Sequence, residues 1–194
     1  MSFRLGLTGS IGMGKSTTAR LFAEEGCAVW DADAAVHRLY SKGGRAVEPL
    51  RAAFPEAVID DQVDRAALKS CLAANPDGFS RLEQIVHPLV GEDRQQFIDA
   101  TTADILVFDI PLLFETGGDV NMDAVVCVTA PAETQRDRVM ARGTMTQEQF
   151  EQIVAKQMPD AEKRKRADYV VVTDTLDHAR QQVRHIVETI RNRL

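Results

Sequence analysis

Short runs of apolar residues alternate along the chain with longer segments in which apolar positions recur at helical spacing. The apolar runs predict five buried strands, at residues 3–8, 27–31, 104–109, 124–129 and 169–173. The helical spacing predicts helices at residues 15–25, 33–40, 133–142, 146–157 and 176–193. Strands that alternate with helices predict an α/β fold with a five-stranded parallel sheet and helices on both faces.

One stretch, residues 46–103, departs from this alternation. Its pattern is mostly helical and more polar, and prolines interrupt it at positions 49, 55, 76 and 88. Within it only residues 57–59 fit a short strand. We interpret the stretch as a helical insertion between strands of the sheet.

Length and charge limit the classes of protein to consider. The 194 residues suit one compact unit with a small insertion, whose core needs neither disulfides nor a structural metal. The formal net charge of −6 argues against sequence-independent nucleic-acid binding, which requires a basic surface. A local pocket for an anionic ligand remains compatible with this overall acidity.

The cysteines and the apolar runs indicate a location. Cys27, Cys71 and Cys127 lie far apart without a CxxC pair, which is typical of free thiols in a reducing cytosol. No apolar run is long enough to span a membrane, and no targeting segment is recognised. We therefore expect a cytoplasmic protein without membrane or nucleic-acid partners, monomeric, with a weak oligomer left open.

A glycine-rich loop follows the first predicted strand and precedes a predicted helix. Residues 9–16 fit the pattern G-x-x-x-x-G-K-[ST], in which backbone N–H groups converge on phosphate oxygens at a helix N-terminus. Lys15 can reach the β- and γ-phosphates, and the Ser16 hydroxyl can bind Mg²⁺. The loop predicts ATP-binding residues: Gly9, Gly12, Met13, Gly14, Lys15, Ser16 and Thr17.

Asp109 ends the third predicted strand, where P-loop proteins place a carboxylate that supports Mg²⁺. Without the P-loop, a strand-end turn residue would be the better interpretation. These residues leave open whether the protein is a kinase, a hydrolysing switch or a motor. A GTP-dependent switch would need Asn-Lys-x-Asp or an equivalent for guanine, and the sequence contains none.

Asp31 and Asp33 stand where the second predicted strand ends, and His37 follows four residues after Asp33. Ligands of open parallel sheets bind beyond the carboxyl ends of the strands, so these side chains face the same crevice as the P-loop. A carboxylate there can accept the proton of an attacking hydroxyl group, and we assign this role to Asp33. Asp33 could also be a helix N-cap, and the two roles are compatible.

Arg138 and Arg142 lie four residues apart on a predicted helix after the fourth strand. Such a helix could close over ATP as a lid, neutralise charge on the transferred phosphoryl group and exclude water. The alternative is a solvated, charged helix face. We interpret the basic run at residues 163–166 as a solvated face of this kind.

Taken together, these motifs resemble the dephospho-coenzyme A kinase family, a group of P-loop kinases similar to nucleoside-monophosphate kinases. The resemblance covers residues 5–174: the P-loop, Asp-Ala-Asp at 31–33 with His37, His-Pro at 87–88, Asp-Ile-Pro-Leu-Leu-Phe-Glu at 109–115, and Gln135, Arg138, Arg142 and Gln157. It implies transfer of the γ-phosphate of ATP, with Mg²⁺, to the 3′-hydroxyl of dephospho-CoA. The products would be CoA and ADP, in the last step of CoA synthesis.

The resemblance also implies an organisation and a set of site residues. The core would comprise residues 1–59, 104–135 and 167–194, the helical CoA-side insertion residues 60–103, and the lid residues 136–166. Asp33, Lys15 and Arg142 would be catalytic, Arg142 would also bind ATP, and Ser16 and Asp109 would hold the metal. The residues implied for the acceptor side are Thr8, Asp31, Asp33, His37, His87, Pro111, Leu112, Leu113, Glu115 and Arg138.

Residues 173–175 depart from the family pattern, because Thr-Asp-Thr replaces a segment of the Asn-Asn-Gly type that lies near the adenine. Ser10 and Met13 also replace smaller residues at variable loop positions. Two alternatives stay open at this point. The chain could be another nucleoside or nucleotide kinase, or an inactive regulator that binds CoA or nucleotide.

Overall fold

The computed structural model describes residues 2–194, and the chain divides into two compact units. Unit 1 contains the chain up to Trp30 and the segment Thr102–Leu194, whereas unit 2 is Asp31–Thr101. The sequence-based scheme placed residues 31–59 in the core. The structure assigns them to unit 2, because their helices pack against the long helix of that unit.

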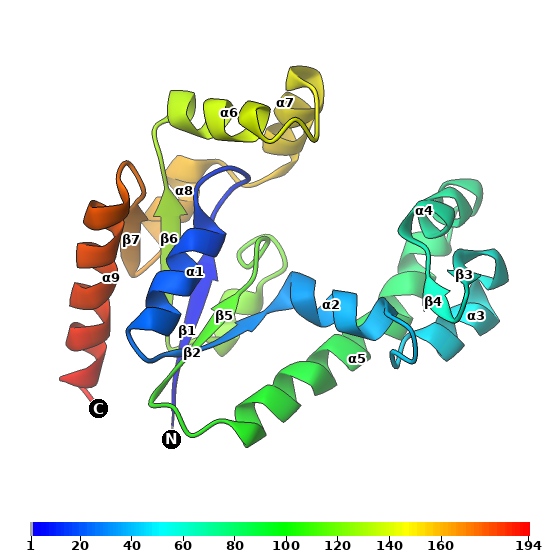
Figure 1. Ribbon diagram of the computed structural model, residues 1–194, viewed down its shortest axis with the longest axis horizontal. Coiled ribbons are helices and arrows are strands. Elements are labelled where there is room, and N and C mark those ends of the chain that lie inside the picture. Colours follow the sequence, from blue (N-terminus) through cyan, green and yellow to red (C-terminus); the bar gives the residue numbers. More distant parts are fainter. Residues whose placement is uncertain (1) are drawn as a thin grey trace. The chain divides into compact units, whose positions relative to one another are not determined.

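Unit 1 is built on a sheet with the strand order β2-β5-β1-β6-β7 (Figure 1). The strands are β1 (Phe3–Thr8), β2 (Ala28–Asp31), β5 (Ile105–Asp109), β6 (Ala124–Thr129) and β7 (Tyr169–Val172). Their pairs β1–β5, β1–β6 and β6–β7 are parallel. The five-stranded parallel sheet that the apolar runs predict is confirmed.

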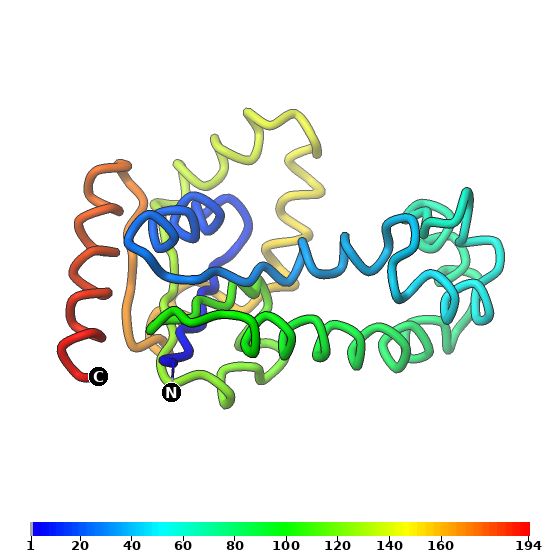
Figure 2. Tube along the Cα trace, turned by 60° about the horizontal axis from the view of Figure 1, so that its bottom comes forward, coloured from blue at the N-terminus to red at the C-terminus, as the bar shows by residue number. Residues whose placement is uncertain are grey.

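Helices cover both faces of this sheet. On one face, α1 (Lys15–Glu24) and α9 (Leu176–Arg191) pack together over alternate strand residues such as Leu5, Leu7 and Val126. Figures 1 and 2 both show α9 running beside β7. On the other face, Val125 packs with Leu113 and Phe114, and α8 (Asp160–Arg166) lies against β6. The period of two along each strand therefore divides the apolar residues between two cores.

Two further helices follow β6 and lie beyond its carboxyl end, on the P-loop side of the sheet (Figure 1). They are α6 (Ala132–Ala141) and α7 (Gln147–Lys156). Thr146 and Gln149 form a capping box that fixes the start of α7. A short 3-10 helix, η2 (Gly118–Asn121), precedes β6.

Unit 2 has a hydrophobic core of its own, which includes Leu39, Leu50 and Phe54. Its elements are α2 (Ala32–Tyr40), α3 (Val47–Ala53), η1 (Pro55–Ala57), β3 (Val58–Ile59), β4 (Gln62–Val63), α4 (Arg65–Ala74) and α5 (Gly78–Ala100). Helix α2 packs on α5, and Arg38 holds Asp93 with two hydrogen bonds of 2.6 and 3.2 Å. The predicted strand at 57–59 is one half of a small antiparallel hairpin whose second strand, β4, the sequence pattern did not predict.

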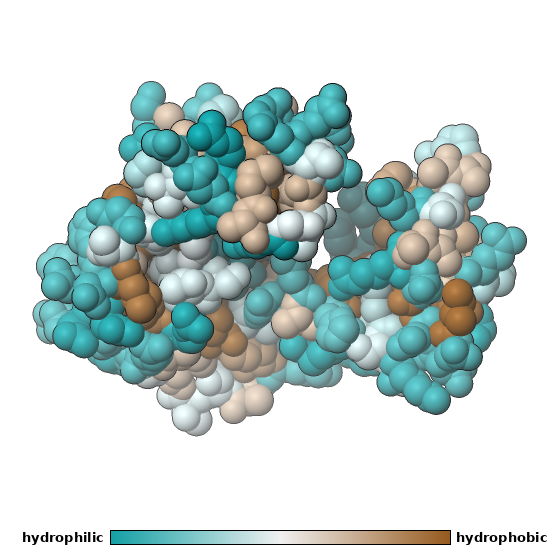
Figure 3. Space-filling model, turned by 45° about the horizontal axis from the view of Figure 1, so that its top comes forward, coloured by the Kyte–Doolittle hydropathy of each residue, from teal (hydrophilic) through white to brown (hydrophobic). Residues whose placement is uncertain are grey.

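Among residues 2–194, no helix is both long and apolar enough to cross a bilayer. On the face drawn in Figure 3, hydrophilic residues cover most of the surface, and hydrophobic residues form small separate patches.

Candidate active site

The loop between β1 and α1 is a curled backbone that only glycine permits at two positions. Gly12 and Gly14 have φ angles of 78° and 93°. A Cβ atom at Gly12 would lie 2.6 Å from a methyl group of Val139, and one at Gly14 would lie 2.9 Å from the Thr173 hydroxyl oxygen. Backbone conformation and close packing therefore both require these glycines, as a phosphate-binding loop does.

Lys15 is the first residue of α1, and its ammonium group forms an ion pair with the carboxylate of Asp109. The pairing follows from the sheet, because Asp109 at the end of β5 lies opposite Leu7 near the end of β1. The Asp109 side chain is only 2 % exposed and that of Lys15 is 16 % exposed. The structure thus brings together the predicted phosphate-binding lysine and the predicted carboxylate of the metal site.

The other predicted donor-side residues surround this pair. Ser16 is exposed in the first turn of α1, and Thr17 is half-buried beside it. The buried Thr8 hydroxyl donates to the carbonyl oxygen of Pro111 at 3.0 Å, which ties the end of β1 to the loop after β5. Arg142 follows the last residue of α6 and is exposed.

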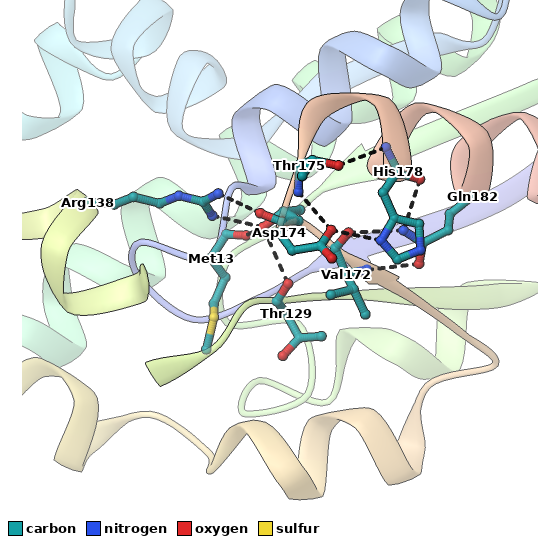
Figure 4. A network of polar contacts seen from close by, with 9 residues as sticks. Met13, Thr129, Arg138, Val172, Asp174, Thr175, His178 and Gln182 are labelled. Carbon is teal, nitrogen blue, oxygen red and sulfur yellow. Dashed lines mark hydrogen bonds and ion pairs between the residues drawn. The ribbon is translucent and has the colours of Figure 1, made fainter. Parts of the chain in front are cut away.

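The turn after β7 contacts the phosphate loop through hydrogen bonds (Figure 4). The buried Thr173 hydroxyl donates to the carbonyl oxygen of Met13 at 2.6 Å and accepts a hydrogen bond of 2.9 Å from Arg138. The Arg138 guanidinium also donates to the carbonyl oxygen of Thr173. Arg138, which the resemblance assigned to the acceptor side, is therefore held against the turn that replaces the family's Asn-Asn-Gly segment.

A second set of bonds fixes the same turn to α9. The Gln182 side chain pairs with both backbone groups of Val172, at 3.0 and 2.9 Å, as a neighbouring strand would. Asp174 bonds His178 at 2.7 Å, and this bond holds the pKa of the Asp174 carboxyl group below its usual value. Sequence reasoning noticed the unusual residues at 173–175 but could not assign these partners.

Four of the residues predicted for the acceptor side belong to unit 2: Asp31, Asp33, His37 and His87. The Asp31 carboxylate accepts from the N–H of Ala34 at 2.9 Å, so Asp31, and not Asp33, is the N-cap of α2. Asp33 lies exposed in the first turn, and within unit 2 no hydrogen bond or ion pair holds its carboxylate. His37 on α2 and His87 on α5 are also exposed.

The segment after β5 mixes exposed and core residues. Pro111 is half-buried and Leu112 is 42 % exposed, but Leu113 is fully buried in the core with Phe114 and Val125. The Glu115 carboxylate faces Lys163 at 2.9 Å and accepts from the N–H of Met158 at 2.9 Å. The side chains of Leu113 and Glu115 thus make their contacts within unit 1.

Lys163 corrects the interpretation of the basic run at residues 163–166. The run is helical, in α8, but the Lys163 side chain is 0 % exposed, whereas its three successors are exposed. Burial opposes ionisation of Glu115, yet the bonds from Lys163 and Met158 outweigh it and hold the pKa of Glu115 below its usual value. The sequence carried no signal for Lys163, because a run of four basic residues does not reveal which of them faces the core.

Residues 2–194 contain no cluster of three or more His, Cys, Asp or Glu that could hold a metal without further ligands. The oxygen donors near the phosphate loop, Ser16 and Asp109, suit a cation that takes most of its ligands from phosphates and water. This donor set fits Mg²⁺ bound together with a nucleotide.

The curled glycine loop, the helix N-terminus behind it and the Lys15–Asp109 pair define a P-loop nucleotide-binding protein. The family profile for dephospho-CoA kinase matches residues 3–177, which is most of the chain. The chain therefore belongs to the dephospho-CoA kinase family and is a kinase.

Individual relatives agree with this membership. A curated dephospho-CoA kinase of Ruegeria pomeroyi is 70 % identical over 191 residues, which cover 98 % of this chain and 97 % of the relative. A crystal structure of a Thermus thermophilus protein is 34 % identical, with a TM-score of 0.87 and 97 % of both chains covered. A dephospho-CoA kinase from Campylobacter jejuni, 24 % identical with a TM-score of 0.72 over all of both chains, shares the fold.

Proposed function

We propose that the protein transfers the γ-phosphoryl group of ATP to the 3′-hydroxyl group of dephospho-CoA and releases CoA and ADP. The observation that carries this proposal is the phosphate loop with its Lys15–Asp109 pair, in a chain that belongs to the dephospho-CoA kinase family. Nucleotide phosphates would draw the Lys15 ammonium group from Asp109, because an anion in the loop offers it a second partner.

On the donor side, the loop N–H groups and the N-terminus of α1 would bind the β- and γ-phosphates. Mg²⁺, held by the phosphates and the Ser16 hydroxyl with Asp109 behind it, would neutralise phosphate charge. Arg142 is exposed at the end of α6 and would approach the phosphates when the lid closes. We propose a lid of residues 136–157, shorter than the 136–166 expected, because α8 packs on β6.

On the acceptor side, we propose that Asp33 orients the 3′-hydroxyl group and accepts its proton as the oxygen attacks phosphorus. Asp33 is suited to this because its carboxylate is exposed and does not cap α2. His37, His87, Pro111 and Leu112 would contact the dephospho-CoA. We assign Leu113 and Glu115 to the structural support of the loop after β5.

The cytoplasmic location also stays a prediction.

The acceptor identity is tested by measuring ADP release from ATP and Mg²⁺ with dephospho-CoA, adenosine, AMP or no acceptor. The proposal expects turnover that depends on dephospho-CoA and yields CoA. Turnover with another acceptor only would keep the P-loop kinase and remove the CoA-side assignments. Turnover with no acceptor dependence would contradict both.

The base is tested by exchanging two neighbouring carboxylates. Asp33→Asn should keep ATP affinity and stability but lower kcat by about 100-fold or more, because a mispositioned proton acceptor costs at least that much. Asp31→Asn removes the same charge and keeps a good N-cap, so its kcat should fall much less. Near-normal turnover of Asp33→Asn would remove Asp33 from this role, and a larger loss in Asp31→Asn would transfer the role to Asp31.

A further inference from the structure

One residue of the phosphate loop has both of its backbone groups bound by glutamine side chains. The N–H group of Ile11 donates to Oε1 of Gln157 at 3.2 Å. The carbonyl oxygen of Ile11 accepts from Nε2 of Gln135 at 2.7 Å. Two side chains from distant parts of the sequence therefore hold the same residue of the loop.

The two glutamines stand at the two ends of the α6–α7 segment. Gln135 lies in the second turn of α6 and is 7 % exposed, and Gln157 is the C-cap residue of α7. Between them the chain leaves the phosphate loop, forms most of α6 and all of α7, and returns (Figure 1). Any displacement of either end of this segment would act on Ile11.

The returning end is also anchored behind Gln157. The next residue, Met158, donates its N–H to Glu115 at 2.9 Å, and Glu115 is paired with the buried Lys163. The residue that follows Gln157 is thus tied to the loop after β5. Gln157 is therefore held on one side by the end of α7 and on the other by the loop after β5.

From this arrangement we propose that Gln135 and Gln157 are positioning residues for nucleotide binding. Together they fix the peptide groups of Ile11, so that the N–H groups of the following loop residues converge on the phosphates. They also connect both ends of the lid segment to that loop. This inference rests on the proposed role of ATP as phosphoryl donor.

The two contacts differ in chemistry, and the difference gives a test. Gln135 acts as a donor to a carbonyl oxygen, so glutamate there would set a carboxylate against that oxygen. Gln157 acts as an acceptor of an N–H group, a role that a glutamate keeps. Because both Gln→Glu changes add the same charge near the phosphates, comparing them cancels the general repulsion of ATP.

The experiment uses Gln135→Met, Gln157→Met, Gln135→Glu and Gln157→Glu. The controls are Gln181→Met and Gln181→Glu on the exposed face of α9, outside the proposed lid. Each Met variant removes one hydrogen bond to the loop and should raise KM for ATP about fivefold. The kcat and KM for dephospho-CoA should stay within about twofold of the unchanged enzyme. Gln135→Glu should raise KM for ATP at least about fivefold more than Gln157→Glu. The Gln181 variants should behave as the unchanged enzyme.

Thermal midpoints of all variants and ATP dissociation constants from calorimetry complete the measurement. Unchanged ATP affinity in both Met variants, or equal effects of the two Glu variants, would contradict the proposal. An equal rise of KM for ATP and for dephospho-CoA would indicate a general disturbance of the fold, and it would also contradict the proposal. If the unchanged enzyme proves inactive on dephospho-CoA, the proposed function fails, but the ATP dissociation constants still test the two glutamines.

Discussion

Residues 2–194 contain two lysine–carboxylate pairs of similar composition and opposite surroundings. At the phosphate loop, Lys15 retains 16 % exposure while its partner Asp109 is 2 % exposed. At α8, Lys163 is fully buried while its partner Glu115 keeps 19 % exposure. In the first pair the cation can reach an incoming ligand, and in the second it cannot. The more exposed residue is the lysine in the first pair and the carboxylate in the second. We therefore expect Lys15 to exchange Asp109 for a ligand, and the Lys163–Glu115 pair to stabilise the fold.

Energetics support this distinction. A lysine in a protein interior must keep a charged partner, because a buried charge that loses its partner is strongly destabilising. Among residues 2–194, the charged partner of Lys163 is Glu115. Lys15 can instead turn towards solvent or a phosphate group when Asp109 no longer holds it. Neutralising the carboxylate of each pair should thus damage different properties.

The largest effect on activity is expected from Asp109→Asn. The isosteric amide keeps the packing but releases Lys15 and removes the negative charge that would support Mg²⁺, so kcat should fall by about 100-fold or more. The thermal midpoint should change little, because Lys15 can reach water. Steady-state kinetics and thermal unfolding test both statements. A near-normal kcat, or a large fall of the thermal midpoint, would contradict the view that the Lys15–Asp109 pair serves activity and the Lys163–Glu115 pair serves stability.

The largest effect on stability is expected from Glu115→Gln. It leaves the Lys163 ammonium group buried without a charged partner, which should cost about 3 kcal/mol. In a chain of this size that lowers the thermal midpoint by about 6–12 °C. The kcat of the folded enzyme at low temperature should stay within about threefold, since the pair acts on structure and not on the reacting atoms.

Lys163→Met is the matched control for this change. It removes the buried cation together with its need for a partner, and Glu115 keeps the N–H of Met158 and some access to water. The free energy of unfolding should then fall by at most about 1 kcal/mol. If Lys163→Met proved as destabilising as Glu115→Gln, the buried charge would not be the reason for the loss.

The contrast between the pairs also explains what the sequence could predict. The apolar runs, the P-loop spacing and the strand that ends in Asp109 are local patterns. They predicted the sheet, the loop and the site residues Lys15 and Asp109, but not the ion pair between these two residues. Lys163 stands in a run of four basic residues, and its burial depends on the rotation of α8 against β6. The glutamine contacts at Ile11 likewise join positions 124 and 146 residues apart. Spacing in one sequence holds no information on such contacts.

Two features of unit 2 differ from what the sequence pattern indicated: the β3–β4 hairpin and the course of α5 through a proline. The turn of the β3–β4 hairpin has Asp60 and Asp61 at φ angles of 51° and 61°, which aspartate adopts more readily than most residues. The sequence pattern did not predict β4, because each strand of the hairpin has only two residues. Helix α5 continues through Pro88, although proline usually ends a helix.

The smallest expected effect is a pH dependence of the free energy of unfolding that comes from the Lys163–Glu115 pair. The bonds to Lys163 and Met158 hold the folded-state pKa of Glu115 below its ordinary value of 4.5. The ionised carboxylate therefore contributes stability that is fully present above about pH 4.5 and is lost as the pH falls through the folded-state pKa. The Glu115→Gln variant lacks this contribution at every pH. The amount by which its free energy of unfolding falls below that of the unchanged protein should therefore shrink at low pH.

Urea unfolding midpoints of both proteins between about pH 7 and pH 3 measure that difference. Asp104 and Asp174, whose pKa values are lowered by hydrogen bonds from Arg191 and His178, are present in both proteins, so their titration cancels. A deficit that stays constant down to pH 3 would mean that Glu115 does not ionise against Lys163. If the difference in unfolding free energy narrows only below the ordinary pKa of a glutamate, the contribution belongs to this pair, because Glu115 is the carboxyl group that the two proteins do not share.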